Sequence, residues 1–587
     1  MSGETSISCS TTVRFGGYEV DTVVGELRKN GLRIHLRGQS FQVLAALLER
    51  PGEIVTREQL RTRLWRGQVF VDFENDLNAI IARLRQVLCD RAEQPRFIET
   101  VPRHGYRFIA EVSYTSVSHQ AYRPRILVLP FVNLSGDRDK EYLVDAITDE
   151  VITALASSYG DQFAVIALTT SMRFKGTRKD LTAIGHELNV QFITEGSVRW
   201  VGDLMGINVR LIQSQDQTQL FARRYETYLS EIFQMHASIA NDVAACIPST
   251  ERKELARPSL RKPTADMGAY DEYIKGRHKL WKYTAESMTE AKQHFEAALA
   301  RDPSFAAACN ALAELYWSVG FWGYVPPEQT DRMGRFYALR ALEIDPMSAE
   351  SHVLVSLFSK KIGNRTEYYD WPSIQNDIAH ARSLNPALRM VRVRHAMVQA
   401  ILGYPDLAAA ELERALESDP LCFDVRAWLT MMLHLGRHFD QALQQGYRLL
   451  DLEPEHFASH QLLGYVYLGM KDFQKSIDAF QKAAQLSNDL PISLGLLGLS
   501  LGLSGHKREA KALLEQLRNR TSREYIKPTC FAFLHIGLGN TDEAFVWTEK
   551  AIDAADRHME PIKTYPFLDP LRSDPRFTAL LRKMNLS

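Results

Sequence analysis

Polar side chains that can contact a nucleic acid flank an apolar helical pattern between residues 76 and 88. In the sequence DLNAIIARLRQVL the apolar residues recur at helical spacing and predict one buried face: Leu77, Ile80, Ile81, Leu84, Val87 and Leu88. Asn78, Arg83 and Arg85 fall outside this stripe. An asparagine amide can read an adenine edge, and an arginine guanidinium can bind a guanine edge or a phosphate. These three residues therefore predict contact with duplex DNA, and the alternative is a solvated helix face.

The charge of the whole chain restricts where such contact can occur. The 587 residues carry 70 Lys plus Arg against 71 Asp plus Glu, so any nucleic-acid affinity must come from a local patch. Residues 1–112 hold 16 basic side chains, 15 of them arginine, against 14 acidic ones. Arginine suits planar, forked recognition better than lysine does. The small excess of positive charge predicts modest affinity for each monomer, set by where the arginines face.

Residue patterns typical of enzymes are not evident. The sequence has no Gly-x-x-x-x-Gly-Lys-Ser/Thr loop and no His-Glu-x-x-His. Two histidine pairs at helical spacing, His434 with His438 and His456 with His460, have no third ligand in sequence. Four glycines suit close helix packing better than a pyrophosphate loop: Gly495, Gly498, Gly502 and Gly505. We therefore expect no enzyme activity, no metal and no cofactor.

The elements that must position the three polar residues can be outlined from residue 13 to residue 112. Residues 13–36 alternate apolar and polar and predict a small antiparallel meander. Helical patterns follow at about 40–49, from a Thr56 cap to Trp65, and at 76–88. Two strands, 97–101 and 106–109, then flank Pro102 and Gly105. Three helices followed by a hairpin predict a winged helix-turn-helix.

The residues of this segment resemble a known family. FQVLAALLERPGEIVTREQLRTRLW, then RLRQVL, then FIETVPRHGYRF, resemble the OmpR/PhoB-type DNA-binding domain of bacterial transcriptional regulators over residues 11–112. In that family the third helix enters the major groove and the hairpin wing touches the adjacent groove or backbone. The resemblance implies helix contacts at Asn78, Arg83 and Arg85. It implies wing contacts at Arg103, His104 and Tyr106, for which the alternatives are backbone contact only or, for Tyr106, core packing.

The resemblance implies further partners and an unusual arrangement. The loop before the third helix can meet RNA polymerase in this family, and the residues compatible with that role are Phe70, Asp72, Phe73 and Glu74. Ala82 stands where many relatives carry a basic residue, which puts one phosphate contact in doubt. The domain usually follows a phosphorylated receiver in a phosphorelay, for which this sequence leaves no room. The arrangement resembles the one-component CadC and ToxR group without the transmembrane helix of that group.

Residues 125–247 predict a second, α/β domain between linkers at 113–124 and 248–266. A buried strand at 126–129 leads into an amphipathic helix, and further strands are expected at 163–168, 191–199, 204–213 and 219–226. The segment resembles the TolB-like amino-terminal domain. The polar loop from Asn133 to Asp137 follows the first strand, where α/β sheets often bind ligands, but a plain turn is the favoured interpretation.

Residues 267–587 predict a helical repeat array. Acidic or amide residues precede proline at 303, 346, 386, 420 and 454, with later spacings of 34 residues, the period of a tetratricopeptide repeat. The segment resembles such an array of about eight units, clearest at 423–456, 457–490 and 491–524. Longer spacings place extra aromatic residues in two inserts, 321–329 and 363–372, as contact points or local packing. Arrays of this kind bind a peptide or protein, and the alternative is a spacer or dimer surface.

Together these patterns predict a multidomain, mainly α-helical chain. Six scattered cysteines, a polar start and the lack of about 18 consecutive apolar residues favour a cytoplasmic protein without membrane contact. We expect a sequence-specific, one-component transcription regulator that binds half-sites as a homodimer and takes a signal through its α/β and repeat domains. One alternative is a repeat scaffold whose winged helix binds protein. The other is a nucleotide or ligand sensor working through the middle domain.

Overall fold

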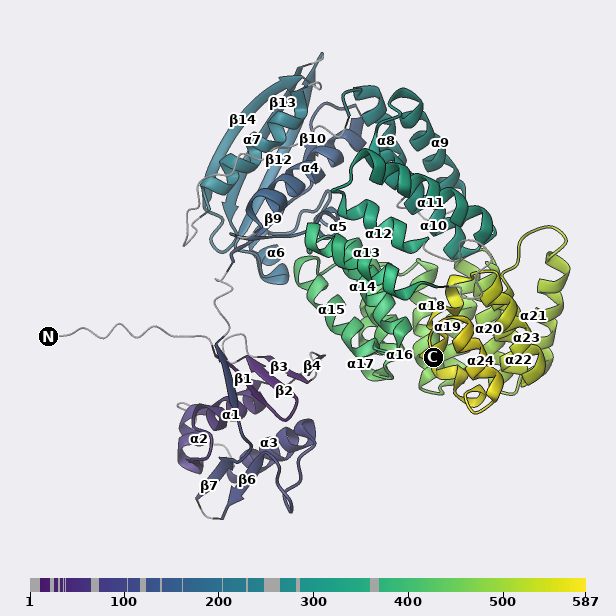
Figure 1. Cartoon of the computed structure of the whole chain (residues 1–587). Coiled ribbons are helices and arrows are strands. Elements are labelled where there is room, and N and C mark those ends of the chain that lie inside the picture. Colours follow the sequence, from purple (N-terminus) through teal and green to yellow (C-terminus); the bar gives the residue numbers. More distant parts are fainter. Residues whose placement is uncertain are drawn as a thin grey trace. The chain divides into compact units, whose positions relative to one another are not determined.

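The computed structural model divides the chain into two compact units, residues 1–122 and residues 123–587 (Figure 1). The structure describes residues 11–21, 26–29, 32–34, 36, 38–64, 73–102, 104–116, 123–137, 140–160, 162–202, 204–228, 231–247, 264–280, 285–358 and 369–587.

A five-stranded antiparallel sheet opens the amino-terminal unit. Its strand order is β4-β3-β2-β1-β8, formed by β1 (Thr11–Phe15), β2 (Tyr18–Asp21), β3 (Glu26–Lys29), β4 (Leu32–Ile34) and β8 (Ser113–Ser116). Gly16 and Gly17 both adopt positive φ in the first turn, a conformation that glycine adopts without steric cost. The predicted meander is therefore present. The segment predicted as a linker from residue 113 begins instead with β8, which pairs with β1.

Three helices pack beside this sheet: α1 (Gly38–Glu49), α2 (Arg57–Leu64) and α3 (Phe73–Leu88). Thr56 caps α2 as predicted, because its Oγ1 accepts from Gln59 N at 3.2 Å while Gln59 Oε1 accepts from Thr56 N at 2.8 Å. α3 begins three residues before the predicted start. Its predicted apolar stripe lies in the core, where Leu77, Leu84 and Leu88 are almost fully buried.

A second, three-stranded sheet of order β5-β7-β6 forms the wing from β5 (Ile54–Thr56), β6 (Ile98–Val101) and β7 (Gly105–Phe108). The sequence did not predict β5, which is only three residues long. Gly105 is required where β7 meets β5, because a Cβ there would lie 2.1 Å from the carbonyl oxygen of Val55. The glycine of the His-Gly-Tyr sequence thus permits the close pairing that holds the wing.

The carboxy-terminal unit starts with a mixed sheet of main order β11-β9-β12-β13-β14, with β10 paired to β12. Its strands are β9 (Arg125–Val128), β10 (Val132–Asn133), β11 (Ala164–Val165), β12 (Phe192–Val201), β13 (Leu204–Gln213) and β14 (Gln219–Tyr228). Its helices are α4 (Glu141–Tyr159), α5 (Leu168–Met172), α6 (Leu181–Leu188) and α7 (Ile232–Ala245). The α/β fold of the middle segment was predicted, whereas α5 and α6 were missed and β11 is shorter than expected.

Within the described residues from 264 onward, sixteen helices form eight successive pairs. They are α8 (Met267–Leu280), α9 (Ala285–Arg301), α10 (Ala306–Trp322), α11 (Pro327–Ile344), α12 (Ala349–Leu357), α13 (Trp371–Leu384), α14 (Arg389–Leu402), α15 (Pro405–Ser418), α16 (Phe423–Leu435), α17 (Phe439–Leu452), α18 (Phe457–Gly469), α19 (Phe473–Leu486), α20 (Pro491–Leu503), α21 (Lys507–Arg520), α22 (Pro528–Leu538) and α23 (Thr541–Asp553). The first helices of three units start at 423, 457 and 491, which is the 34-residue period of the sequence. Gly502 allows α20 to approach α22, since a Cβ there would lie 2.3 Å from the backbone of Gly537.

The chain ends in two 3-10 helices and one α-helix: η3 (Arg557–Lys563), η4 (Pro566–Leu571) and α24 (Pro575–Lys583). η3 contacts α14, and η4 contacts α18, so this segment folds back onto earlier repeats. Tyr369 and Trp371, from the second aromatic insert, are buried against it. Trp371 Nε1 donates to Met584 O at 2.9 Å, and Tyr369 OH donates to Glu560 Oε1 at 3.2 Å. These two aromatics serve local packing.

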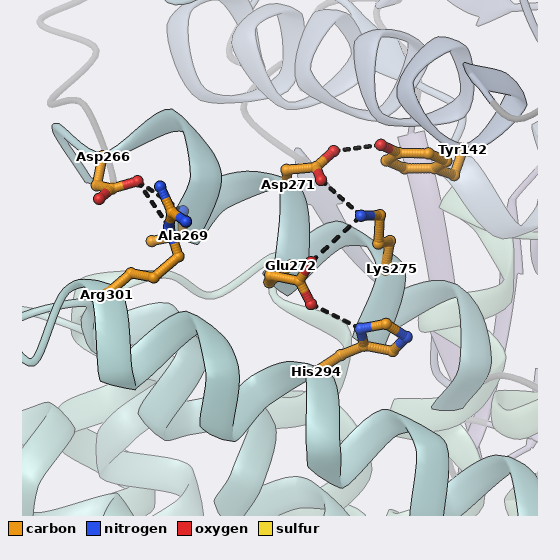
Figure 2. A network of polar contacts seen from close by, with 8 residues as sticks. All are labelled: Tyr142, Asp266, Ala269, Asp271, Glu272, Lys275, His294 and Arg301. Carbon is orange, nitrogen blue, oxygen red and sulfur yellow. Dashed lines mark hydrogen bonds and ion pairs between the residues drawn. The ribbon is translucent and has the colours of Figure 1, made fainter.

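The α/β domain and the repeats share contacts and a core. Figure 2 shows Tyr142 on α4 bonded to Asp271 on α8, which also contacts Lys275. Lys275 Nζ lies 2.7 Å from Asp271 Oδ2. One hydrophobic cluster extends from strand residues such as Ile126 to Tyr270 and Phe305 of the first repeats. The predicted linker at 248–266 therefore does not separate two independent cores.

The same domain also contacts the repeats at a second place. Thr170 Oγ1 of α5 donates to Asp419 Oδ1 at 2.6 Å, and Arg125 Nη2 donates to Glu417 O at 2.6 Å. Arg173 forms an ion pair with Glu453 at 2.8 Å. Two separated contact regions fix the α/β domain to the repeat array as one body.

Candidate nucleic-acid interface

The solvent-facing side of α3 is a narrow stripe of small and polar residues. Beyond the buried stripe, the side chains of Ala79, Ala82, Arg83 and Gln86 are exposed, and their spacing places them on one helical face. Two alanines leave room for close approach of the helix backbone to another surface. Gln86 was missed in the sequence, although it follows Arg83 by three residues on this face and has the amide that can read adenine.

Arg83 is exposed near the middle of this stripe. Among the described residues it has no hydrogen bond or ion pair. Its guanidinium can therefore accept a phosphate or a base edge without breaking an internal contact.

Arg85 behaves differently, although it stands only two residues away. It is half-buried, and its Nη2 donates to Ile98 O and to Thr100 Oγ1, both at 2.8 Å. These bonds tie α3 to β6 of the wing. The structure therefore places Arg85 between α3 and the wing.

Asn78 and Tyr106 form a second tie between α3 and the wing. Tyr106 is only 2% exposed, and its hydroxyl donates to Asn78 Oδ1 at 2.9 Å. The Arg57 guanidinium lies 5.3 Å from the centre of the Tyr106 ring, within cation–π range. Asn78 itself is exposed, and its amide nitrogen keeps its donors for another partner. Burial of the Tyr106 ring agrees with the core-packing alternative.

The remaining predictions concern wing residues expected to contact DNA and residues expected to contact RNA polymerase. His104 is exposed, and its Nδ1 lies 2.9 Å from Pro102 O. Arg103 lies outside the described residues, as do Phe70 and Asp72. Phe73 and Glu74 fall in the first turn of α3.

Ion pairs use many of the arginines elsewhere in the unit. Arg63 binds Glu49 through two hydrogen bonds of 2.7 and 2.6 Å, and these bonds hold the pKa of the Glu49 carboxyl below its usual value. Arg107 pairs with Glu99 at 2.6 Å. Positive charge is therefore largely neutralised on these surfaces, which distinguishes Arg83 from its neighbours.

Other candidate sites carry no comparable chemistry. Asn133 Nδ2 donates to Asp137 O at 2.8 Å, and Ser135 N donates to Asn133 Oδ1 at 3.0 Å. The Asn133 side chain is therefore hydrogen-bonded within the loop, as in an ordinary turn. His434 is buried, whereas His438 Nε2 lies 2.8 Å from Asp406 Oδ1. Within the part of the chain that the structure describes, no group of three His, Cys, Asp or Glu side chains is placed to hold a metal.

Comparisons with known proteins identify two parts of the chain. Residues 31–108 match the family model described as "Transcriptional regulatory protein, C terminal", and residues 457–490 match "Tetratricopeptide repeat". The amino-terminal domain is therefore an OmpR/PhoB-type winged-helix domain of the kind found in bacterial transcriptional regulators. The helix pairs that follow the α/β domain are tetratricopeptide repeats.

Two relatives match longer stretches of the chain. Transcriptional regulator HilA of Salmonella typhimurium is 21% identical over 509 residues, which cover 84% of this chain and 80% of the relative. Putative adenylate cyclase 3 of Rhizobium meliloti is 31% identical over 240 residues, and the chain spans only 40% of its length. The relative that covers most of this chain is a transcriptional regulator.

One solved structure is similar to the amino-terminal domain. The DNA-binding domain of Klebsiella pneumoniae RstA, in complex with the RstA box, is 31% identical; the match covers 17% of this chain and 96% of that one, with a TM-score of 0.16. Across the described ranges, the helices are all too short or too polar to cross a membrane.

Proposed function

We propose that this chain is a sequence-specific transcription regulator whose winged helix binds duplex DNA. The observation that carries the proposal is the exposed face of α3, where Arg83 stands without an internal partner among the described residues. Asn78, Gln86 and Arg83 supply the amide and guanidinium groups that distinguish base pairs in the major groove. His104 and Arg103 contact the adjacent DNA backbone, while Arg85 and Tyr106 position helix and wing relative to each other.

The remaining partners follow from this role. The segment that ends in the first turn of α3, with Phe70, Asp72, Phe73 and Glu74, contacts RNA polymerase. The excess of only two positive charges in residues 1–112 favours two copies on repeated half-sites, because each copy binds weakly alone. The proposal implies a cytoplasmic protein without catalytic activity, since bacterial chromosomal DNA lies in the cytoplasm.

The α/β domain and the repeats receive the signal in this proposal. Their shared core and two contact regions support joint movement, because a change in the repeats reaches the α/β domain through α8 and the 417–453 segment. The signal then alters pairing of the winged helices or their contact with polymerase. The boundaries of the domains at 11–112, 125–247 and 267–587 remain predictions.

The experiment that tests the proposal is selection of genomic fragments by the purified full-length chain at two salt concentrations, followed by sequencing. We expect enrichment of a short repeated motif that survives the higher salt. Retention of random fragments that is lost at higher salt would contradict the proposal, since non-specific binding is dominated by phosphate contacts. That outcome would favour a scaffold whose winged helix binds protein, and pull-down of a tight protein partner would identify it.

A further inference from the structure

An apolar cavity of about 240 Å³ lies among the first helices of successive repeats. α10, α14, α16 and α18 supply its walls, together with η3. The apolar residues that dominate these walls are Trp317, Phe321, Met397, Trp428, Met431 and Leu462. Aromatic contacts connect distant repeats here, since the rings of Phe321 and Trp428 lie 6.0 Å apart. The first aromatic insert therefore helps to form the cavity.

The chain's own η3 segment closes one side of this cavity. His558 of η3 stacks on Phe321, with ring centres 4.6 Å apart. The buried Lys527 Nζ lies 2.8 Å from Asp556 Oδ1 and donates to Phe321 O at 2.9 Å. Burial and the Lys527 charge lower the pKa of His558 to about 4, so its Nδ1 accepts a hydrogen bond from Lys527 at neutral pH. These contacts hold η3 where a bound peptide would otherwise run.

Arg394 is a buried cation of this cavity wall that keeps an unused donor. It lies on α14, is only 4% exposed, and donates from Nη2 to Ser356 O at 3.0 Å. Its Nε has no hydrogen-bond partner, and none of the carboxylates that the structure describes forms an ion pair with it. A guanidinium keeps its charge in proteins, so Arg394 is a buried positive charge with unused donors.

The other charged groups on the wall are already paired. Arg389 forms an ion pair with Asp424 at 3.0 Å, Arg557 pairs with Asp331, and Glu314 pairs with Arg277 at 2.6 Å. Glu560 accepts a hydrogen bond from Tyr369. The charge of Glu560, on the same wall, favours the Arg394 guanidinium, while the Nε of Arg394 stays unbonded and can donate to an anionic group in the cavity.

We infer that this cavity binds a compact organic carboxylate. The carboxylate accepts hydrogen bonds from Arg394, and an aromatic or branched aliphatic body lies among Trp317, Trp428 and Met397. The size agrees with this class, since drug-sized pockets have roughly 300–1,000 Å³ and this one is smaller. An extended peptide is disfavoured because η3 covers the cavity. The inference rests on the proposed function only in treating the ligand as the signal.

The test uses the full-length chain without DNA, and its probes are phenylacetate, hexanoate and the neutral phenylacetamide. Calorimetry and tryptophan fluorescence measure binding. We expect saturable binding of at least one carboxylate with Kd below about 1 mM, and binding of the neutral amide at least about tenfold weaker. Arg394→Met weakens carboxylate binding by about tenfold or more, and Arg394→Lys restores part of it.

Arg392→Met is the matched control, because Arg392 lies on the same helix and binds Pro386 O instead of lining the cavity. It leaves carboxylate binding unchanged. Binding of neither carboxylate, equal binding of phenylacetate and its amide, or equal weakening by both substitutions overturns the inference. If Arg394→Met does not fold, the ratio of the phenylacetate and phenylacetamide dissociation constants for the unaltered chain decides whether the inference holds. DNA selection is measured separately, so failure of the regulator proposal is distinguishable from failure here.

Discussion

Arginines in the two units of this chain occupy opposite environments. In the amino-terminal unit, Arg83 is exposed and without an internal partner among the described residues, and Arg63 and Arg107 pair at the surface. In the carboxy-terminal unit, Arg394 and Arg557 are 4% exposed. An exposed guanidinium can bind an outside anion at little desolvation cost, whereas a buried one must find its anion inside the fold. Position in the fold, and not residue type, therefore separates an arginine proposed to contact DNA from one proposed to hold a ligand or the fold.

The largest effect is expected where a buried cation is removed from the carboxy-terminal unit. Lys527→Met leaves Asp556, 1% exposed, without its ion-pair partner. Breaking such a pair lowers the free energy of unfolding by about 3–5 kcal/mol. Lys482→Met is the surface control, since Lys482 is 3.9 Å from Glu455 and exposed; we expect a change under about 1 kcal/mol. Chemical denaturation measures the change in unfolding free energy for both variants. Equally small changes would contradict the difference between the buried and the surface cation.

The second largest effect is expected from acid, which destabilises the carboxy-terminal unit. Burial lowers the pKa of His434 to about 3, and its ring nitrogens have no hydrogen-bond partner among the described residues. The unfolded chain protonates near pH 6.5 while the folded chain does not, so stability falls as the pH drops from about 6.5 toward 3. The loss at pH 4 is on the order of 3 kcal/mol for this histidine. Denaturation at several pH values measures it, and His434→Phe should flatten the dependence; an unchanged slope would contradict the account.

Within the amino-terminal unit, the largest loss of stability is expected from substitution of Arg85. Arg85→Ala removes two hydrogen bonds between α3 and β6. Because they involve a charged donor, we expect the unit to lose about 1.5–3 kcal/mol of stability. Arg91→Ala, at an exposed position, should change it by less than about 0.5 kcal/mol. Hydrogen exchange of the wing amides measures the difference, and full protection in Arg85→Ala would show that the tie is not structural.

The smallest effect concerns the Tyr106 hydroxyl. Tyr106→Phe keeps the buried ring and removes the bond to Asn78, so we expect a loss of about 0.5–1.5 kcal/mol. The Asn78 side chain becomes freer to rotate, and DNA specificity should decline more than overall affinity. Binding of matched and mismatched duplexes measures this. A uniform loss across all duplexes would instead indicate a phosphate contact.

Much of the fold could be predicted from short-range pattern. The apolar stripe of α3, the Thr56 cap and the 34-residue repeat each depend on residues near one another in sequence. The shared core of the α/β domain and the repeats could not, because it joins residues such as Ile126 and Phe305 that carry no joint pattern. The strand β8 was missed for the same reason: its partner β1 lies about a hundred residues earlier.

The sequence predicted the candidate site from residue types, and the structure adds the contacts that each of these residues makes. Asn78, Arg83 and Arg85 all have DNA-binding chemistry, and only the structure distinguishes the unpartnered Arg83 from the tethered Arg85. Helical spacing contained the information that Gln86 shares the face of Arg83. No spacing could have placed Arg394 beside a cavity, since the other residues that line it come from several repeats and from η3.

Binding of Arg83→Ala to a selected DNA motif across a series of salt concentrations tests the central claim most directly. We predict a loss of about 1–3 kcal/mol in binding with relaxed specificity at one position if Arg83 reads a base, or a salt slope lower by about one if it binds a phosphate. Unfolding stability should match that of the unaltered chain. Unchanged affinity, specificity and salt slope would contradict the claim that the exposed face of α3 binds DNA through Arg83.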